Sequence, residues 1–272
     1  MAALYEELKQ RISFPPLIAE KAPYLIKFAE TPEELLAIQK LRYRVFNEEQ
    51  GKGLRSSDAD GVDRDEYDDV SVHLMVCHEG TEGPVGTYRI ILSQESTESL
   101  YSSREFEIHG FEPLLHNTLE VGRSCVAPEH RNGSVVALLW AGISAIMTRS
   151  RMRYLTGCVS LEDQRPEAAW ALSEYFRSQD LMTDAVKGIP REPFRTAPCE
   201  REKIDALLSD PRALRSLFPP LLKGYFRMGA KICSEPAFDY EFGTLDFLII
   251  LDVAKLPERY NKHFNVKLEG QA

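Results

Sequence analysis

The sequence predicts an α/β fold in which a twisted mixed β-sheet carries helices on both faces. The first observation is the order of the hydrophobic patterns, which runs strand, helix, three strands, helix, strand, helix, and later a helix and closing strands. The second is composition: 272 residues, 43% hydrophobic and 28% charged, can build one sizeable core. The third is that no glycine-rich nucleotide-binding pattern follows a predicted strand, so Rossmann and P-loop sheets are unsupported.

The best-marked element is a helix over residues 31–51. Thr31 is a good N-cap, Pro32 suits the first helical position, and Glu34 completes a capping box. Apolar residues recur at helical spacing after this start, and Gly51 can end the helix. We therefore expect an amphipathic helix with one face in the core.

The other elements follow from the same periodicities. Strands are expected at residues 24–29, 72–79, 84–93, 118–126, 153–161 and 245–253. Helices are expected at residues 134–150, 166–177, 219–232 and 257–264, the third of them breaking at Gly229. The polar, acidic segment 52–69 is expected to be a loop.

One domain is expected over residues 24–265. Residues 1–23 are expected to form an N-terminal amphipathic helix or extension, and residues 266–272 a tail. Residues 178–215 contain four prolines and show little periodicity. We interpret that segment as a helical insertion before the last helix and strands.

Charge and cysteine usage exclude several classes of protein. The net charge of −9 does not favour nucleic-acid binding over the whole surface. Five widely spaced cysteines without a CxxC pair argue against a disulfide framework and a zinc site, and the six histidines show no ligand spacing. We therefore expect no metal, and a reducing cytoplasmic compartment.

Hydropathy gives no membrane-spanning segment. Acidic and basic residues interrupt the N-terminus, so no signal peptide is expected. The longest apolar run, residues 135–147, is shorter than the ~20 residues that span a bilayer. Peripheral contact with the inner membrane is expected through the N-terminal helix and residues 217–222, with packing of these segments against the domain as the alternative.

An acid and a base lie inside one predicted buried strand, where Glu120 and Arg123 are three residues apart. On a regular strand they would face opposite sides of the sheet. A β-bulge at Gly122 would bring both to one face, and bulges are common beside active sites. The alternative is a structural ion pair on a half-exposed face, and this segment alone does not decide between them.

Other arginines and acids extend this polar set. Arg42 lies at the margin of the apolar face of the first helix, and Arg89 lies in the middle of a predicted strand. A buried arginine needs a carboxylate partner, which the acidic segment 63–69 or Glu120 can supply. The pattern fits a network around a small zwitterion, although each residue alone has an ordinary solvated interpretation.

The loop at residues 128–134 joins a strand to the very apolar helix. Gly133 allows close approach of the backbone, and Ser134 can cap the helix. The unpaired N–H groups of a helix N-terminus favour an anion such as a phosphate. As a bare pattern, an ordinary strand–helix loop is the better explanation of these residues.

Four short motifs, taken in order, resemble the autoinducer-synthase branch of the GNAT superfamily. They are Arg42 with Phe46, Asp65 with Tyr67 and Asp68, Gly86 with Arg89, and Glu120 with Arg123. Longer segments resemble the ornithine N-acyltransferase family ("hemolysin-like") of that superfamily more closely. They include LRYRVFNEEQG, GRSCVAPEHRNG, PPLLKGYFRMGA and FDYEFGTLDFLI, and they spread over residues 40–264.

The resemblance implies a GNAT-like fold and an N-acyltransferase. The donor would be a (3-hydroxy)fatty acyl chain on the 4′-phosphopantetheine arm of acyl-carrier protein, and the acceptor the α-amine of L-ornithine, giving lyso-ornithine lipid. No cofactor would be bound permanently. The loop RNGSVV lacks the full Arg/Gln-x-x-Gly-x-Gly/Ala pattern of acetyl-CoA-dependent members, which favours the carrier-protein arm over free coenzyme A.

The resemblance also assigns roles to residues. Glu120 is the expected base, with Asp65 or Asp68 as the second choice. Arg42, Arg89 and Arg123 would organise the acids or bind the acceptor carboxylate, and the substrate-binding set is Arg42, Phe46, Tyr67, Arg89 and Arg123. The donor-binding set is Cys125, Val126, Arg131, Asn132, Gly133 and Ser134. Arg149, Arg151 and Arg153 are expected to contact the acidic carrier protein.

Three other functions stay open at this stage. Two keep the fold and change the acceptor: a long-chain N-acyl amino acid synthase with another amino acid, and an acyl-homoserine-lactone synthase. The third is a non-enzymatic lipid-binding or membrane-lytic protein. The C-terminal segments favour the ornithine branch, and a lipid carrier has no use for buried arginines and acids.

Overall fold

The computed structural model describes residues 18–54, 57, 59–93 and 96–258. These residues form two compact units, each assembled from separate stretches of chain. Unit 1 comprises the described parts of Met1–Leu92, Leu119–Met152 and Glu258–Ala272, and unit 2 comprises those of Ser93–Thr118 and Arg153–Pro257. The expected N-terminal helix and nearly all of the expected 257–264 helix lie outside the described residues, and the single-domain expectation stays a prediction.

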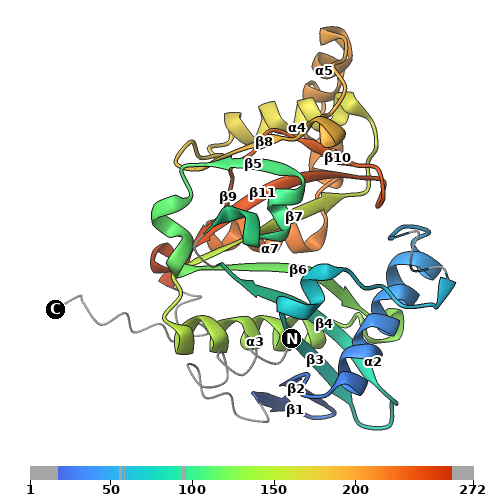
Figure 1. The fold of residues 1–272 in the computed structure, drawn as a ribbon. Helices are drawn as coiled ribbons and strands as arrows, with labels where there is room; N and C mark the ends of the chain where they lie inside the picture. Colours follow the sequence, from blue (N-terminus) through green and yellow to red (C-terminus); the bar gives the residue numbers. More distant parts are fainter. Residues whose placement is uncertain (1–17, 55–56, 58, 94–95, 259–272) are drawn as a thin grey trace. The chain divides into compact units, whose positions relative to one another are not determined.

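Unit 1 is an antiparallel sheet with a helix on each face (Figure 1). Its strands are β1 (Ala19–Lys21), β2 (Tyr24–Phe28), β3 (Val72–His78), β4 (Pro84–Leu92) and β6 (Thr118–Val126), and its helices are α2 (Pro32–Tyr43) and α3 (Ser134–Ser150). The strands pair antiparallel in the order β1-β2-β3-β4-β6. Every one of these elements except β1 was predicted.

The two faces of this sheet differ in chemistry. Helix α3 packs closely on the apolar face, because a Cβ atom added at Gly142 would come within 2.8 Å of Ile26 and 2.9 Å of Leu74. His73 and Arg89 pair across β3 and β4 and face the other side. Helix α2 supplies partners for that second face, which is where the polar side chains gather.

Helix α2 begins as expected. The Thr31 side chain accepts a hydrogen bond from the N–H of Glu34 at 3.3 Å. The Glu34 carboxylate accepts from the backbone N–H of Thr31, as the capping box predicts. It also accepts from the N–H of Glu30 at 2.8 Å and pairs with Lys27, contacts that the sequence did not predict.

The expected single α-helix over residues 31–51 changes type part-way. After Tyr43 the chain forms a π-helical turn, Arg44–Glu49, in which the N–H of Gln50 donates to the carbonyl of Val45 at 3.2 Å. Helical periodicity in the sequence does not distinguish these two forms. π-Helical turns are rare and occur often beside functional sites.

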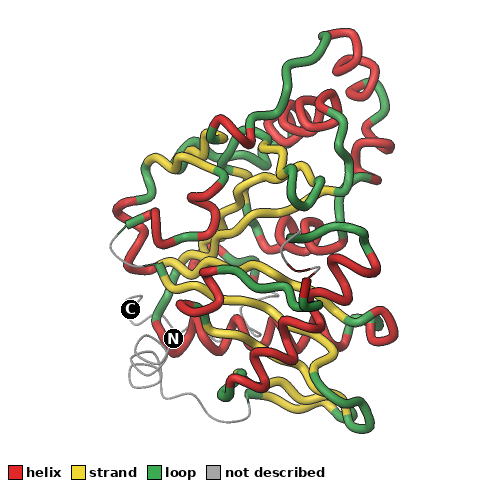
Figure 2. The backbone as a smooth tube through the Cα atoms, turned by 45° about the vertical axis from the view of Figure 1, so that its right-hand side comes forward, coloured by secondary structure: helices red, strands yellow, loops and turns green. Residues whose placement is uncertain are grey.

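Unit 2 combines one set of paired strands, a separate two-stranded sheet and several α-helices (Figure 2). Its strands are β5 (Phe106–His109), β7 (Tyr154–Leu161), β8 (Lys187–Pro190), β9 (Lys231–Ile232), β10 (Ala237–Asp239) and β11 (Thr244–Asp252), and its helices are α4 (Pro166–Ser178), α5 (Arg201–Leu208), α6 (Pro211–Ser216) and α7 (Pro220–Met228). Strand β11 pairs antiparallel with β7, β9 and β10, and β5 pairs antiparallel with β8.

Helix α7 ends where the sequence indicated. Gly229 adopts a left-handed conformation at φ 94° and caps the helix, as glycine does most easily. The last residues of the expected 219–232 helix are strand β9 instead. Phe218 and Leu222 are buried, which favours the packing alternative for segment 217–222 over a membrane surface.

The segment 178–215 is more regular than its prolines suggested. It contains β8, α5 and α6, and β8 is fixed by its pairing with β5. Its status as an insertion stays a prediction. Among the residues that the structure describes, none of the helices is both long and apolar enough to cross a membrane.

Candidate active site

A buried ion-pair network on the second face of unit 1 centres on Arg42. The guanidinium is fully enclosed, with 0% exposure, and donates to Asp63 Oδ1 at 2.7 Å and to the Asp63 carbonyl at 2.6 Å. Two further N–H groups donate to the two oxygens of Asp68, each at 2.8 Å. These contacts direct four of the N–H donors of Arg42 to Asp63 and Asp68 inside the protein.

Asp68 links α2 to strand β4. Besides Arg42, it accepts hydrogen bonds from Gln39 at 3.0 Å and from Arg89 at 3.1 Å. Burial opposes ionisation of Asp68, but the hydrogen bonds and charge of Arg42 outweigh it and hold the pKa of Asp68 well below its usual range. The pKa of Arg42 is raised, because its acidic partners outweigh its own burial.

His73 lies beside this network in a neutral state. Its Nε2 is 3.2 Å from the carbonyl oxygen of Asp68. Burial is the main cause that lowers the pKa of His73 to about 4, and the positive charges of Arg42 and Arg89 act in the same direction against the attraction of Asp68. An imidazole with such a pKa carries no charge near neutral pH.

The β-bulge predicted at Gly122 is present. Thr87 pairs with Cys125 and Arg89 with Gly122, so β6 holds one residue more than β4 between these pairs. Arg123 occupies the bulge with φ 49°, a conformation that is uncommon for residues other than glycine. Its Nη2 donates to Asp65 Oδ2 at 3.0 Å, so the bulge does turn Arg123 onto the polar face.

Glu120 lies on the same face. It pairs with Ile91 across β4 and β6, two residues along each strand from the Arg89 and Gly122 pair, so its side chain points to the side on which Arg89 points. Glu120 is buried. The bulge therefore places Glu120 and Arg123, which are three residues apart in the sequence, on the same face of the sheet.

Asp65 joins the two strand arginines. It accepts from Arg89 at 2.5 Å and from Arg123 at 3.0 Å, and its side chain also caps the turn by accepting from the N–H of Tyr67 at 3.0 Å. The Arg89 guanidinium lies 5.6 Å from the centre of the Tyr67 ring. Phe46 lies half-buried in the π-helical turn.

Asp63 belongs to the network although it was not among the predicted site residues. It binds Arg42, and its Oδ1 lies 3.4 Å from Nε of Arg123. The acidic run 63–69 contains five acids, and the sequence offers no local signal for which of them turn inward. The network thus balances three arginines (Arg42, Arg89 and Arg123) with three aspartates (Asp63, Asp65 and Asp68).

The end of β6 is apolar at Cys125. Burial raises the pKa of the Cys125 thiol to about 12, so the thiol stays protonated and suits packing, not nucleophilic attack. The N–H of Ala127 donates to the carbonyl of Val85 at 2.8 Å. Hydrogen-bonded pairs alternate along an antiparallel ladder, so the N–H of Cys125 points at β4 and the N–H of Val126 points away from it.

The loop before α3 is held by side-chain contacts. Arg131 donates to the carbonyl of Val126 at 3.0 Å and clamps both carboxylate oxygens of Glu49 at 2.6 and 2.7 Å. Asn132 donates to the hydroxyl of Tyr24 at 2.9 Å, and that hydroxyl lies 3.1 Å from Nδ1 of His130. The loop is therefore tied to β2 and to the π-helical turn.

The cap of α3 differs from the one predicted. Gly133, with φ 84°, is the N-cap, and Ser134 is the first helical residue. The N–H of Ser134 donates to Asn132 Oδ1 at 3.0 Å. The expected Ser134 cap is therefore wrong, because Asn132 reaches this N–H from two residues earlier and no side chain is needed at Gly133.

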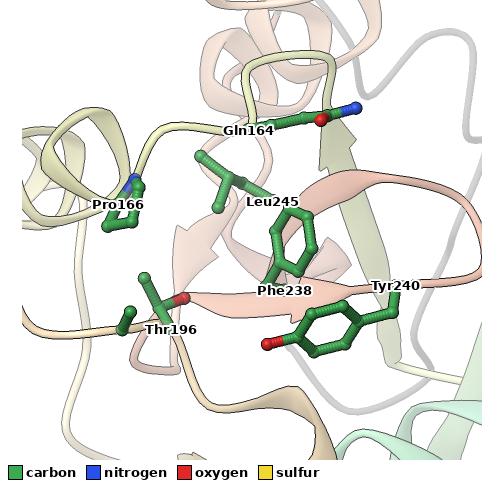
Figure 3. A pocket seen from close by; sticks show the side chains of 7 residues that line it. Gln164, Pro166, Thr196, Phe238, Tyr240 and Leu245 are labelled. Atoms are coloured by element: carbon green, nitrogen blue, oxygen red, sulfur yellow. The ribbon is translucent and has the colours of Figure 1, made fainter.

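A pocket in unit 2 is a weaker candidate for the site. It has a volume of about 140 Å³ and lies among residues of α4, the segment before α5 and the β10–β11 hairpin, including Pro166, Thr196, Phe238 and Leu245 (Figure 3). Ordinary ligand pockets measure roughly 300–1,000 Å³. None of the predicted site residues lines it, so the ion-pair network remains the better candidate.

Comparison with known proteins finds relatives over most of the chain. Residues 41–141, which contain the whole network, match the acetyltransferase (GNAT) domain family. The chain is 32% identical over 252 residues to the L-ornithine N(alpha)-acyltransferase of Brucella abortus strain 2308, with 89% of each chain covered. It is also 32% identical over 253 residues to the L-ornithine N(alpha)-acyltransferase of Agrobacterium fabrum strain C58, with 89% of this chain and 85% of that one covered.

Among solved structures, the N-acyl amino acid synthase FeeM from uncultured soil microbes is similar with a TM-score of 0.48 and 10% identity, over 85% of this chain and 92% of FeeM. The GNAT domain match and the two relatives confirm the predicted fold class and the acyltransferase class of enzyme. By identity and coverage, this chain belongs to the L-ornithine N(alpha)-acyltransferase family.

Proposed function

We propose that this protein transfers a 3-hydroxyacyl chain from acyl-carrier protein to the α-amine of L-ornithine and so forms lyso-ornithine lipid. The names of the two relatives support the acceptor and the reaction class. The observation in this chain that best supports the proposal is the balanced ion-pair network, together with buried Glu120, which lies on the same sheet face beside the bulge. Such a site can accept a proton from an ammonium group in a water-poor environment.

The chemistry is a direct acyl transfer. The α-ammonium of ornithine loses a proton to Glu120, and the neutral nitrogen attacks the carbonyl carbon of the thioester. A C–N bond forms, the C–S bond breaks, and the pantetheine sulfur leaves and takes up a proton. No covalent enzyme intermediate is required, in keeping with the protonated thiol of Cys125.

Glu120 suits the role of base better than the two aspartates. Asp68 is held ionised between Arg42 and Arg89, and a base whose pKa lies far below the working pH accepts a proton poorly. Asp65 is fixed by Arg89 and Arg123 and caps a turn. We infer that the aspartates and arginines shape the pocket for the acceptor while Glu120 takes the proton.

The donor arm is proposed to bind at the bulge and the α3 loop. The N–H of Val126 points away from β4 and is the better of the two predicted donors to the thioester oxygen. The first turn of α3 is proposed to hold the phosphate of the pantetheine arm through N–H groups other than that of Ser134, which already donates to Asn132. Arg131 shapes the loop through Glu49, so we assign it a positioning role and not a direct phosphate contact.

Docking of the carrier protein is proposed at the C-terminal end of α3. Arg149 and Arg151 are exposed there. Arg153, the third predicted contact, is paired with Asp252 at 2.8 Å and is the weakest of the three. Charge reversal at Arg149 and Arg151 should raise the KM for the carrier protein and leave kcat unchanged, whereas an unaltered KM would refute this docking surface.

The test of the function is product identification by mass spectrometry. The protein is incubated with 3-hydroxyacyl-carrier protein and a panel of amino acids, and the proposal expects N-acyl ornithine as the main product. Glu120→Gln should reduce turnover by about 10²–10⁴-fold. The matched control is Glu129→Gln, an exposed position in the nearby loop, which should behave like wild type.

Two results would overturn these assignments separately. A main product with a different amino acid would refute ornithine as acceptor and leave the reaction class intact. Wild-type turnover of Glu120→Gln at saturating substrates would refute Glu120 as the base. Circular dichroism and thermal unfolding of the variant confirm that any loss of turnover is not a loss of fold.

A further inference from the structure

Unit 2 holds a cluster of three buried carboxylates that takes no part in the proposed chemistry. Glu105, Asp239 and Asp246 are 1%, 4% and 3% exposed. One carboxylate oxygen from each lies within 4.8 Å of the other two. Three like charges gathered away from water repel one another and lose their hydration, so the arrangement needs a compensating positive charge.

The surrounding side chains leave that compensation incomplete. Among the described residues, neither Asp239 nor Asp246 forms an ion pair with a lysine, arginine or histidine. The neighbouring Arg104 pairs with Glu241 at 2.9 Å, and Arg191 pairs with Glu98 at 3.1 Å, so both arginines form ion pairs with carboxylates outside the cluster. This contrasts with the network of unit 1, where arginines and aspartates balance one to one.

A second observation concerns the orphaned oxygen atoms. Oδ1 of Asp246 and Oγ1 of Thr244 are buried, and neither forms a hydrogen bond of ordinary geometry. Thr244 lies two residues before Asp246 on the same face of β11, and its hydroxyl, the hydroxyl of Ser160 and the carboxyl of Glu105 lie near the Asp246 carboxylate. Buried polar atoms in folded proteins nearly always have a partner, so these two atoms indicate a ligand between the carboxylates.

The cluster is also held in shape. One oxygen of Asp239 accepts from the N–H groups of Glu241 and Phe242 at 2.7 and 3.1 Å, which fixes this carboxylate in the β10–β11 turn. Asp246 is fixed by the pairing of β11 with β7 and β10. The backbone of Glu105 is fixed because its carbonyl accepts from the N–H of Arg191 at 2.8 Å.

We propose that Glu105, Asp239 and Asp246 bind one hard divalent cation, with Ca²⁺ the best match, and that Thr244 lies at the edge of this site. Oxygen-only ligands favour Ca²⁺ or Mg²⁺ over zinc or copper. Two oxygens on opposite sides of a calcium ion lie about 4.6–5.2 Å apart, so one ion reaches all three carboxylates without rearrangement. The ion would connect the chain around Glu105 with the β10–β11 hairpin.

This site is structural and independent of the proposed acyl transfer. The test uses the full chain after treatment with a chelator and dialysis, titrated with CaCl₂, MgCl₂ or MnCl₂ alone. Bound metal is measured by equilibrium dialysis with elemental analysis, and the unfolding temperature is measured with and without metal. The expected result is one ion per chain and a higher unfolding temperature with metal, since a ligand that binds only the folded state stabilises it.

Substitutions test whether the ion binds at this cluster. Asp246→Asn should weaken binding by at least about tenfold and abolish the metal-dependent rise in unfolding temperature. The matched control is Asp184→Asn, which removes an exposed acid of the same unit and should leave both measurements unchanged. If Asp246→Asn fails to fold, Glu105→Gln and the wild-type stoichiometry still decide the question.

The outcomes are distinct. Less than one tenth of an ion per chain at about 1 mM free metal, the weak end of calcium sites in proteins, would overturn the proposal. So would a chelated protein that becomes more stable on acidification and gains nothing from metal, because protons would then neutralise the cluster. Formation of N-acyl ornithine is measured separately, so neither result bears on the proposed function.

Discussion

Removing one charge from the buried network should cost a large part of the stability of unit 1, and Asp68→Asn is the sharpest change. Asp68 accepts two hydrogen bonds from Arg42, one from Arg89 and one from Gln39. The asparagine amide can accept only at its oxygen, and its NH₂ group would face guanidinium donors. Three buried arginines would then share two carboxylates.

The magnitude follows from the burial of Arg42. Hydrogen bonds to charged groups contribute about 1.5–3 kcal/mol each, but those within one network are not additive. Breaking a buried ion pair by removing one partner costs about 3–5 kcal/mol, because the remaining charge stays buried without compensation. We expect the free energy of unfolding of Asp68→Asn to fall by about 3–5 kcal/mol.

Equilibrium unfolding in urea, followed by circular dichroism near neutral pH, measures this loss. The control is Asp69→Asn, an exposed neighbour in the same turn, which should stay within about 0.5 kcal/mol of wild type. A loss below about 1 kcal/mol for Asp68→Asn would refute the reasoning, because exposed ion pairs have effects of that size.

The difference in stability between wild type and Asp68→Asn should also depend on pH, in a definite direction. The pKa of Asp68 is lowered in the folded protein, so its contribution is fully present above the unfolded value of about 3.9 and is lost as the pH falls through the lower, folded value. The stabilities of wild type and Asp68→Asn should therefore converge in strong acid. A constant difference across that range would contradict the linkage.

Three further predictions concern unit 1. Burial lowers the pKa of His73 to about 4, so as the pH falls below 6.5 the unfolded chain takes up a proton before the folded protein does. The free energy of unfolding of wild type, measured by urea titration, should therefore fall between pH 6.5 and pH 4. The His73→Gln variant should show a flatter dependence of that free energy on pH. Cys125→Ala should retain near-wild-type turnover in the product assay, since a thiol with a pKa of about 12 is not the nucleophile, and a dead, folded variant would contradict this. Gly86→Ala should cost about 1–3 kcal/mol by thermal unfolding, because its Cβ would lie 2.4 Å from Cγ1 of Val135, and adding Val135→Ala should recover part of the loss.

The sequence located the elements whose burial pattern is local. Strands β3, β4 and β6 and helix α3 lie where periodicity indicated, because each presents its apolar residues at a fixed spacing along the chain. The bulge was also predictable, since Gly122 stood between two charged residues that a regular strand would separate. The short strands β5 and β8 were missed, because they pair across a long stretch of sequence and carry little pattern of their own.

The sequence predicted less well which charged side chains pair with one another. The acidic run 63–69 predicted carboxylates near Arg42 and Arg89, but which of them turn inward depends on the turn that the folded loop adopts. The carboxylate cluster of unit 2 left no trace in the metal-ligand spacings, because Glu105 is more than a hundred residues from Asp239. Local spacing finds sites built on one helix or loop and not those assembled by tertiary packing.

The pairing of β7 with β11 has a consequence for synthesis of the chain. Residues 162–243 separate the two strands, so β7 emerges from a ribosome well before its partner exists. At about 5–20 residues per second, this exposed interval lasts several seconds. During it the apolar edge of β7 is open to wrong pairing, and a chain that stops before Thr244 keeps that edge open permanently. Premature termination late in the gene should therefore yield aggregated protein and not a shorter enzyme.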